Sequence, residues 1–318
     1  MKEIVLASKR RWNWKVFLVL VGLNIPAMFA ILPYTIDLQN TSSGTDLVAT
    51  YGWGTIVLDR LINSLPIVLL GGIGLILANR IGLGLPFVEG WIRGTPVPVR
   101  FRNVVAIALI MAIILVVTSL FLHNLVLDPP LNAMLAKLGI SLPAGVQTPP
   151  LYGLLAAFSA GITEETLYRL FGLSLIAWLG GLLFHDSDGR PNRIVFWVAN
   201  ILFAVGFGLA HLPKAAAMGL PVNTFVVTYT LVLNGIGGLL FGWTFWIFGL
   251  ESAILAHFFA DVIMYTFLPL IGLQNSGTAK YLATAGVIVL VLLALVWAWR
   301  TLISKDQSYV ASSELKGS

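Results

Sequence analysis

The chain of 318 residues contains no cysteine, and only 10% of its residues are charged. Without cysteine it can form no disulfide framework, no thiolate metal site and no cysteine nucleophile. Soluble domains contain roughly 25% charged residues, so the shortage of charge excludes an ordinary soluble protein. Hydrophobic residues instead make up 58% of the chain. The composition therefore predicts an integral membrane protein of the all-α class.

Long apolar runs alternate with polar or proline-rich breaks along the chain. A transmembrane helix needs about 20 mostly apolar residues, and we expect about eight such helices. The runs lie at 16–34, 61–78, 103–122, 151–178, 194–212, 222–248, 252–271 and 281–303. The breaks include a predicted polar loop at Asn40–Gly44, the segment Gly94–Pro98 and the pair Pro149-Pro150. The prediction is a polytopic membrane protein whose helices surround a polar intramembrane cavity.

The basic residues predict the orientation of the chain in the cell membrane. There are 19 Lys and Arg against 14 Asp and Glu. This modest excess favours basic loops beside a bilayer over binding to nucleic acid, for which we predict no role. The N-terminal leader and the second and fourth loops are rich in Lys and Arg, whereas the first and third loops contain only Arg60 and Lys137. Both termini are therefore predicted to lie in the cytoplasm.

Ionisable side chains are concentrated in the middle of the chain. The first three apolar runs contain none, whereas the block from 151 to 271 contains Glu164, Glu165, Arg169, His211, Glu251, His257 and Asp261. Each such group costs about 2.5–3.5 kcal/mol in hydrocarbon, so they are expected to share a polar cavity. We therefore divide the chain into a scaffold at 1–150, a catalytic core at 151–271, and a last span with a disordered cytoplasmic tail at 272–318.

Two adjacent glutamates open the polar block. Glu165 and Arg169 are spaced i and i+4 on a helix and can form an ion pair, which we interpret as structural support. Glu164 points in another direction, about 100° away. A carboxylate without a local partner suits a general base, although it could equally form a hydrogen bond to a neighbouring helix.

Two histidine-containing segments complete the set. Phe207 and His211 share one helix face, and His257 and Asp261 are also spaced i and i+4. That spacing suits two ligands of one metal ion, or a histidine oriented by a carboxylate. Together with Glu164 these groups can activate a water molecule and stabilise an oxyanion.

The ordered motifs resemble a known family of intramembrane proteases. Glu164-Glu165-x-x-x-Arg169, then Phe207-x-x-x-His211, then His257-x-x-x-Asp261 are similar to the three motifs of the CAAX prenyl protease type II family, also called CPBP or Abi. The resemblance covers roughly 150–265. It implies that Glu164 is the catalytic base, that His211 shares its water, and that His257 and Asp261 act on the oxyanion side or bind a metal.

One departure from the family pattern concerns the last of these residues. The third motif ends in Asp261, where the family commonly has Asn. An amide donates a hydrogen bond to an oxyanion, whereas an ionised carboxylate repels it. Either Asp261 is protonated, or His211, His257 and Asp261 hold a divalent metal such as zinc, or another group stabilises the oxyanion. The metal-free version is favoured, because these three ligands form a sparse set.

These features predict an intramembrane endopeptidase that hydrolyses a peptide bond with activated water. The expected partners are the lipid bilayer and a protein or peptide substrate, which can be lipidated or membrane-bound. Two alternatives stay open. One is a bacteriocin-immunity or membrane-binding protein of the same fold without catalysis. The other is an ion-coupled transporter, in which buried Glu and His are also common, but which the lack of internal repeats disfavours.

Overall fold

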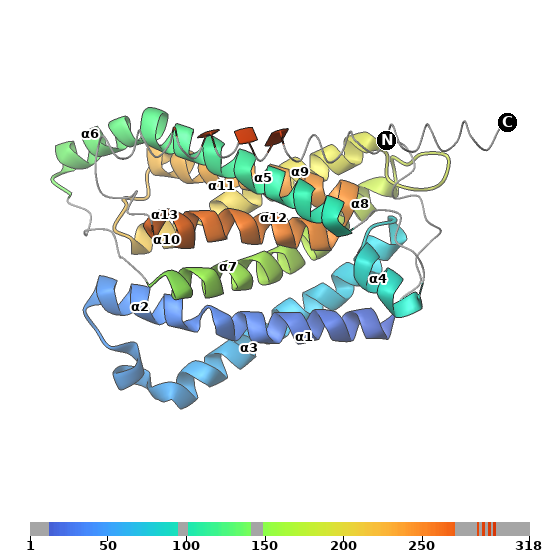
Figure 1. Cartoon of the computed structure of the whole chain (residues 1–318), viewed down its shortest axis with the longest axis horizontal. Helices are drawn as coiled ribbons and strands as arrows, with labels where there is room; N and C mark the ends of the chain where they lie inside the picture. The colour runs from blue at the N-terminus through green and yellow to red at the C-terminus, as the bar shows by residue number, and fades with distance from the viewer. Residues whose placement is uncertain are drawn as a thin grey trace.

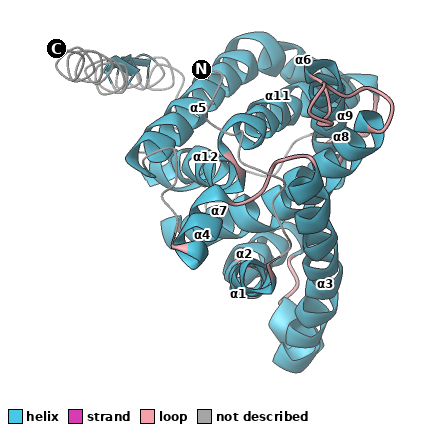
Figure 2. Cartoon of the chain, turned by 90° about the vertical axis from the view of Figure 1, so that its right-hand side faces the viewer, coloured by secondary structure: helices cyan, strands magenta, loops and turns pink. Residues whose placement is uncertain are grey.

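A computed structural model describes residues 13–94, 101–140 and 149–270, together with a few separate positions between 285 and 296. Throughout these ranges the regular structure is helical, as Figures 1 and 2 show. The long helices lie side by side and run between the two ends of the molecule (Figure 1). The predicted all-α polytopic architecture is confirmed.

The helices are bounded as follows. They are α1 Trp14–Ala30, α2 Leu32–Ser43, α3 Leu47–Arg80, α4 Pro86–Arg93, α5 Phe101–Phe121, α6 Asp128–Leu138, α7 Pro150–Glu164, α8 Ser174–Gly181, α9 Arg193–Leu209, α10 Leu212–Ala217, α11 Thr224–Phe248, α12 Leu250–Val262 and α13 Leu268–Leu270. Three π-helical segments, η1 Leu122–Leu127, η2 Glu165–Leu173 and η3 Ile263–Phe267, interrupt them.

Six helical stretches are long and apolar enough to cross a membrane. They are Trp14–Thr41, Leu47–Arg80, Phe101–Asn124, Arg193–Ala217, Thr224–Phe248 and Leu250–Leu270. Each coincides with one of the eight predicted runs. The run at 151–178 forms the continuous helix α7–η2–α8, which contains the charged site residues. The run at 281–303 and the tail lie outside the continuously described ranges, so the total of eight spans stays a prediction.

The first predicted loop is instead the end of a helix. Residues 40–43 form the last turn of α2, which ends at Gly44 in a left-handed conformation with φ of 67°. Two residues later the side chain of Asp46 accepts hydrogen bonds from the N–H groups of Val48 and Ala49 and begins α3. The polar sequence was therefore wrongly interpreted as a loop, because Asn, Ser and Thr are tolerated in the solvated last turn of a helix. By contrast, Pro150 begins α7 as expected.

Glycines bring the scaffold helices close to the helix that contains the paired glutamates. A side chain at Gly74 of α3 would collide with the backbone of Leu170 in η2. On the other side of α7, a side chain at Gly161 would press on the backbone at Ile254 of α12. Small residues allow such close packing in membranes. The helix α7–η2 is therefore held between α3 and α12, which fixes the position of Glu164 and Glu165.

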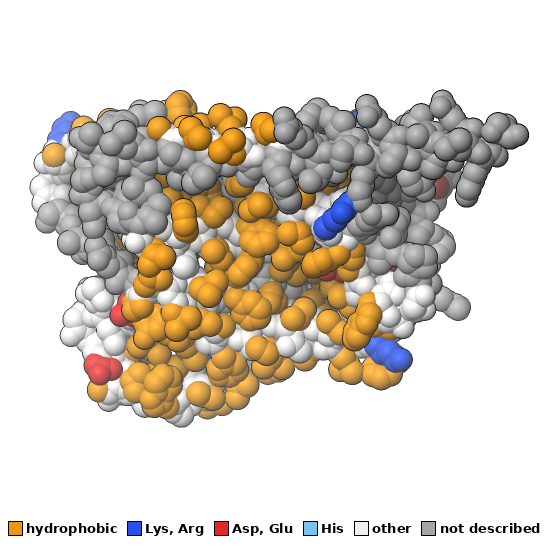
Figure 3. All heavy atoms as spheres, in the orientation of Figure 1, with side chains coloured by type: hydrophobic (Ala, Val, Ile, Leu, Met, Phe, Trp, Pro, Cys, Tyr) orange, Lys and Arg blue, Asp and Glu red, His pale blue; other side chains and the backbone are white. Residues whose placement is uncertain are grey.

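Basic residues are unequally distributed between the two ends of the molecule, and the orientation of the chain in the membrane stays a prediction. The end formed by α4 and the starts of α1, α5 and α9 contains Lys15, Arg80, Arg93, Arg102, Arg190 and Arg193. The opposite end, formed by α2, α6 and α10, contains the acidic Asp37, Asp46 and Asp128 and the basic Lys137 and Lys214. A broad apolar face lies between them (Figure 3). By the positive-inside rule this distribution predicts that the first end faces the cytoplasm.

This assignment predicts the result of topology mapping. Reporter fusions after Arg11, at Gly94 and after Lys305 are expected to report a cytoplasmic location, and a fusion at Asn40 an external one. The reason is the excess of Lys and Arg at one end of the bundle. Paired phosphatase and fluorescent-protein reporters measure both outcomes. An external signal at Gly94 would contradict the proposed orientation.

Candidate functional site

The site is built where α7 passes into a π-helical segment. Glu164 is the last residue of α7 and Glu165 the first of η2. Two hydrogen bonds fasten this junction: the hydroxyl of Thr166 donates to the carbonyl of Ile162 at 2.8 Å, and Asn24 of α1 donates to the hydroxyl of Thr166 at 3.2 Å. π-Helical turns inside α-helices are frequent at functional sites because they reposition side chains.

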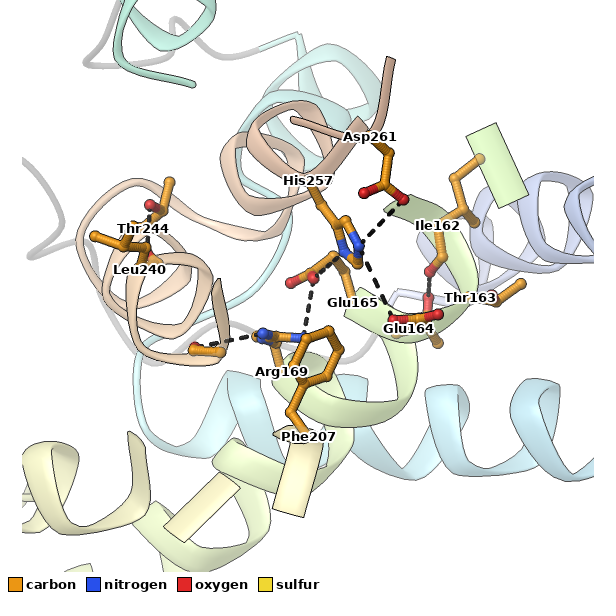
Figure 4. Close-up of polar contacts among 12 residues, drawn as sticks. Ile162, Thr163, Glu164, Glu165, Arg169, Phe207, Leu240, Thr244, His257 and Asp261 are labelled. Atoms are coloured by element: carbon orange, nitrogen blue, oxygen red, sulfur yellow. Dashed lines mark hydrogen bonds and ion pairs between the residues drawn. The ribbon is translucent and has the colours of Figure 1, made fainter. Parts of the chain in front are cut away.

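Glu165 lies at the centre of a buried hydrogen-bond network (Figure 4). Its side chain has no solvent exposure, and a single oxygen, Oε1, is 3.0 Å from a guanidinium nitrogen of Arg169 and 2.7 Å from Nδ1 of His257. The predicted ion pair with Arg169 is confirmed. The contact with His257 adds a partner that comes from another helix, α12. Glu165 therefore joins the first motif to the third.

The guanidinium group of Arg169 is buried, and several neighbouring groups stabilise its positive charge. A guanidinium nitrogen donates to the backbone carbonyl of Gly238 at 3.3 Å. The guanidinium lies over the rings of Phe207 and Phe241, with its central carbon 4.4 and 5.3 Å from their centroids. Cation–π contacts of this kind stabilise a desolvated positive charge. Arg169 is therefore a structural connection between η2, α9 and α11.

The imidazole ring of His257 is held so that its second nitrogen, Nε2, faces the carboxylates of Glu164 and Asp261. Phe241 stacks on the imidazole at 4.5 Å between centroids and 18° between planes. With Nδ1 bound to Glu165, Nε2 lies 3.9 Å from Oε2 of Glu164 and 3.6 Å from Oδ2 of Asp261 (Figure 4). The two adjacent glutamates thus lie on opposite nitrogens of one ring. The 3.6 and 3.9 Å separations are too long for direct hydrogen bonds, so neither carboxylate is hydrogen-bonded to Nε2.

Exposure increases from the buried network toward Glu164. The side chain of His257 is 6% exposed, that of Asp261 19% and that of Glu164 33%. Glu164 is therefore the most accessible carboxylate of the network. The cavity that the sequence predicts around these groups stays a prediction, which this gradient of exposure supports.

His211 lies beside this cluster, and the ring of Phe207 separates it from His257. It lies at the corner between α9 and α10, and Pro213 is in the first turn of α10. Its Nδ1 is 2.8 Å from the backbone carbonyl of Phe207, and its ring contacts that of Phe207 at 4.8 Å between centroids. The ring of Phe207 in turn lies 6.0 Å from that of His257. The predicted shared face of Phe207 and His211 is confirmed, but within the described ranges no direct contact joins His211 to Glu164 or His257.

The metal alternative requires three ligands close together. Among the described residues, no three His, Cys, Asp or Glu side chains are grouped so that they could hold a metal ion. His257 and Asp261 converge, whereas His211 lies behind Phe207. The proposed ligand set His211, His257 and Asp261 therefore stays a prediction that rests on sequence.

The polar block of the sequence contains one residue that the fold uses elsewhere. Oε1 of Glu251 accepts hydrogen bonds from the backbone N–H groups of Phe87 and Val88, at 2.9 and 3.1 Å. These two residues lie in the first turn of α4, whose positive N-terminal end favours a carboxylate. The expectation that every ionisable residue of the block shares one cavity is therefore wrong for Glu251. Its position near the start of α12 gave no sign of these long-range partners.

One residue near the site is absent from the predicted set. Lys214 of α10 interacts electrostatically with Asp261 and Glu164. It lies three residues after His211, and this closeness in sequence was the available signal. A lysine in a short polar segment is usually a solvated surface residue, so the sequence alone gave no reason to select it.

Comparison with known proteins agrees with the geometry. Residues 146–263 match a family model described as type II CAAX prenyl endopeptidase, Rce1-like. No curated protein and no solved structure gives a significant match to the chain. The matched segment contains all three motifs and the whole network around His257. Over this segment the chain is similar to the type II CAAX prenyl endopeptidases, as the three motifs had indicated.

Proposed function

We propose that the protein is an intramembrane endopeptidase in which Glu164 activates water for attack on a peptide carbonyl. The observation that carries the proposal is the convergence of Glu164 and Asp261 on Nε2 of His257, at 3.9 and 3.6 Å. Glu164 is also the most exposed of the three side chains. A general base has to reach both water and substrate, so Glu164 fits that role better than the fully buried Glu165.

The reaction begins with proton transfer from water to Glu164. The water oxygen bonds to the carbonyl carbon, and the carbonyl oxygen takes up negative charge. His257 donates from Nε2 to this oxygen, because the carboxylate of Glu165 on Nδ1 stabilises a positively charged imidazole ring. Glu164 then returns the proton to the amide nitrogen as the C–N bond breaks. The products are a new carboxyl terminus and a free amine.

His211 is proposed to orient the same water. Its Nδ1 is engaged with the carbonyl of Phe207, which requires the proton to reside on Nδ1 in the neutral ring. Nε2 is then an acceptor that can receive a hydrogen bond from water. Phe207 supports this arrangement from both sides, because its ring packs against His211 and His257.

Cleavage of a defined peptide tests the function directly. The purified protein in detergent micelles is incubated with a farnesylated peptide that ends in a CAAX sequence, the substrate type named in the family description. Mass spectrometry in ¹⁸O-labelled water is expected to show one internal cleavage with one heavy oxygen in the new carboxyl terminus. Intact peptide bound by the protein would instead support a binding function, and proton uptake into liposomes without cleavage would support a transporter.

Asp261→Asn distinguishes metal-free from metal-dependent chemistry. In the metal-free reaction, residue 261 helps to stabilise the oxyanion, and an amide donates a hydrogen bond without needing a proton. We therefore expect kcat to be maintained or raised in the purified variant. Activity is measured together with metal content and with sensitivity of the wild type to chelators. An inactive variant, combined with stoichiometric zinc in the wild type, would show that Asp261 is a metal ligand.

A further inference from the structure

Lys214 is held between two aromatic rings at the border of the site. Its Nζ lies 5.1 Å from the ring centroid of Tyr265 and 5.6 Å from that of Tyr34. The two rings are 6.2 Å apart and tilted by 58°. The three residues come from α10, η3 and α2, which are far apart in sequence. Cation–π contacts with two rings restrain the ammonium group of an otherwise exposed residue.

The helix that contains His257 leads directly to this lysine. Asp261 lies one turn beyond His257, and Tyr265 one further turn along, where its ring contacts Lys214. Lys214 interacts electrostatically with Asp261 and with Glu164. Across the described part of the chain no carboxylate approaches Nζ within ion-pair distance. The ammonium therefore acts on these carboxylates at longer range, without being bonded to one of them.

Around His257 the carboxylates outnumber the positive groups, even when the imidazole ring itself is positively charged. Glu164, Glu165 and Asp261 surround the ring, and Arg169 balances Glu165. Once Glu164 has taken the proton from water, the carboxylate of Asp261 remains beside Nε2, where the tetrahedral oxygen is expected to form. An additional negative charge is costly there, because charges interact strongly in a poorly solvated site.

We propose that Lys214 is a positioning residue that acts as the counter-charge of Asp261 and permits an oxyanion to form beside an acidic side chain. This inference rests on the proposed hydrolytic function and deepens it. It explains how a site with Asp at position 261 can perform a reaction for which Asn is the more suitable residue. Lys214 acts through Asp261, and the aromatic pair Tyr34 and Tyr265 keeps its ammonium in place.

A double-mutant cycle with Asp261 tests this coupling. Lys214→Met is made in the wild type and in the Asp261→Asn background, and kcat and KM are measured on the farnesylated CAAX peptide. In the wild type we expect kcat to fall about 10- to 100-fold with little change in KM. In the Asp261→Asn background the same change is expected to cost less than about threefold, because the carboxylate that needs the counter-charge is absent.

Charge-preserving and surface controls separate this role from simple packing. Lys214→Arg is expected to recover most of the kcat that Lys214→Met and Lys214→Gln lose. Lys137→Met removes an exposed lysine at the same end of the molecule, on α6, and is expected to leave kcat unchanged. Melting temperatures in detergent are compared for all variants, since a purely structural role would lower stability without the dependence on residue 261.

Several results would overturn the inference without affecting the proposed function. Equal losses of kcat in both backgrounds would show that Lys214 does not act through Asp261. A rise in KM alone in both backgrounds would show that Lys214 binds an anionic group of the substrate. The hydrolytic function itself is tested in the same assay by cleavage with the wild type and its loss in Glu164→Gln, so the two proposals fail separately.

Discussion

Glu164→Gln is expected to abolish peptide cleavage while the protein accumulates and folds normally. The amide keeps the shape of the side chain but cannot accept a proton from water. Loss of a general base typically lowers the rate about 10²–10⁴-fold. The side chain is one-third exposed and lies 3.9 Å from His257, so no short buried contact is lost. The measurement is kcat on the farnesylated CAAX peptide, together with yield and melting temperature.

Glu251→Gln provides a matched control for the change from carboxyl to amide. Glu251 also lies in a membrane-spanning helix, but its Oε1 accepts backbone N–H groups at the start of α4. A glutamine oxygen can accept the same hydrogen bonds, so cleavage by this variant is expected to stay within a few-fold of the wild type. A fully active Glu164→Gln enzyme would show that another group removes the proton from water.

The fold class could be predicted because the membrane imposes it on the sequence. Every backbone polar group in hydrocarbon has to be bonded within its own segment, so long apolar runs become helices. The runs at 103–122, 194–212 and 222–248 accordingly match α5, α9 and α11 closely. Helix ends were less predictable, as residues 40–43 show, because a polar last turn and a loop have the same composition.

The site could be predicted to the level of residues but not of contacts. Helical periodicity gave the pairs Glu165–Arg169 and His257–Asp261, since both are one turn apart. The bond between Glu165 and His257 joins two helices whose relative rotation the sequence does not contain. It also depends on the π-helical turn at η2, for which no sequence rule is specific enough.

The same limit explains which polar residues were wrongly included or left out. Glu251 was counted with the polar block that was expected to share one cavity, but its partners Phe87 and Val88 are more than 160 residues away. Lys214 was left out, although α10 brings it to Tyr265 and the electrostatic environment of Asp261. Tertiary packing therefore decides which of the charged residues belong to one chemical unit.

Glu165→Gln is expected to destabilise the protein, in contrast to Glu164→Gln. The side chain of Glu165 is fully buried, and one of its oxygens serves both Arg169 and His257. With an amide in its place, the buried guanidinium of Arg169 loses its carboxylate. Removing one partner of a buried ion pair typically costs about 3–5 kcal/mol. We expect a lower yield, a lower melting temperature in detergent, and reduced cleavage because His257 also loses its charged partner.

Removal of both charges tests whether the pair causes this loss. Arg169→Met alone leaves the carboxylate of Glu165 buried with only His257 as a partner, and is expected to be destabilising as well. In the double variant Glu165→Gln/Arg169→Met no uncompensated charge remains, so part of the stability is expected to return while cleavage stays low. Stability losses that simply add would contradict a coupled pair. If Glu165→Gln is stable but inactive and Glu164→Gln is stable and active, then Glu165 is the base and the roles of the two glutamates are the reverse of those proposed here.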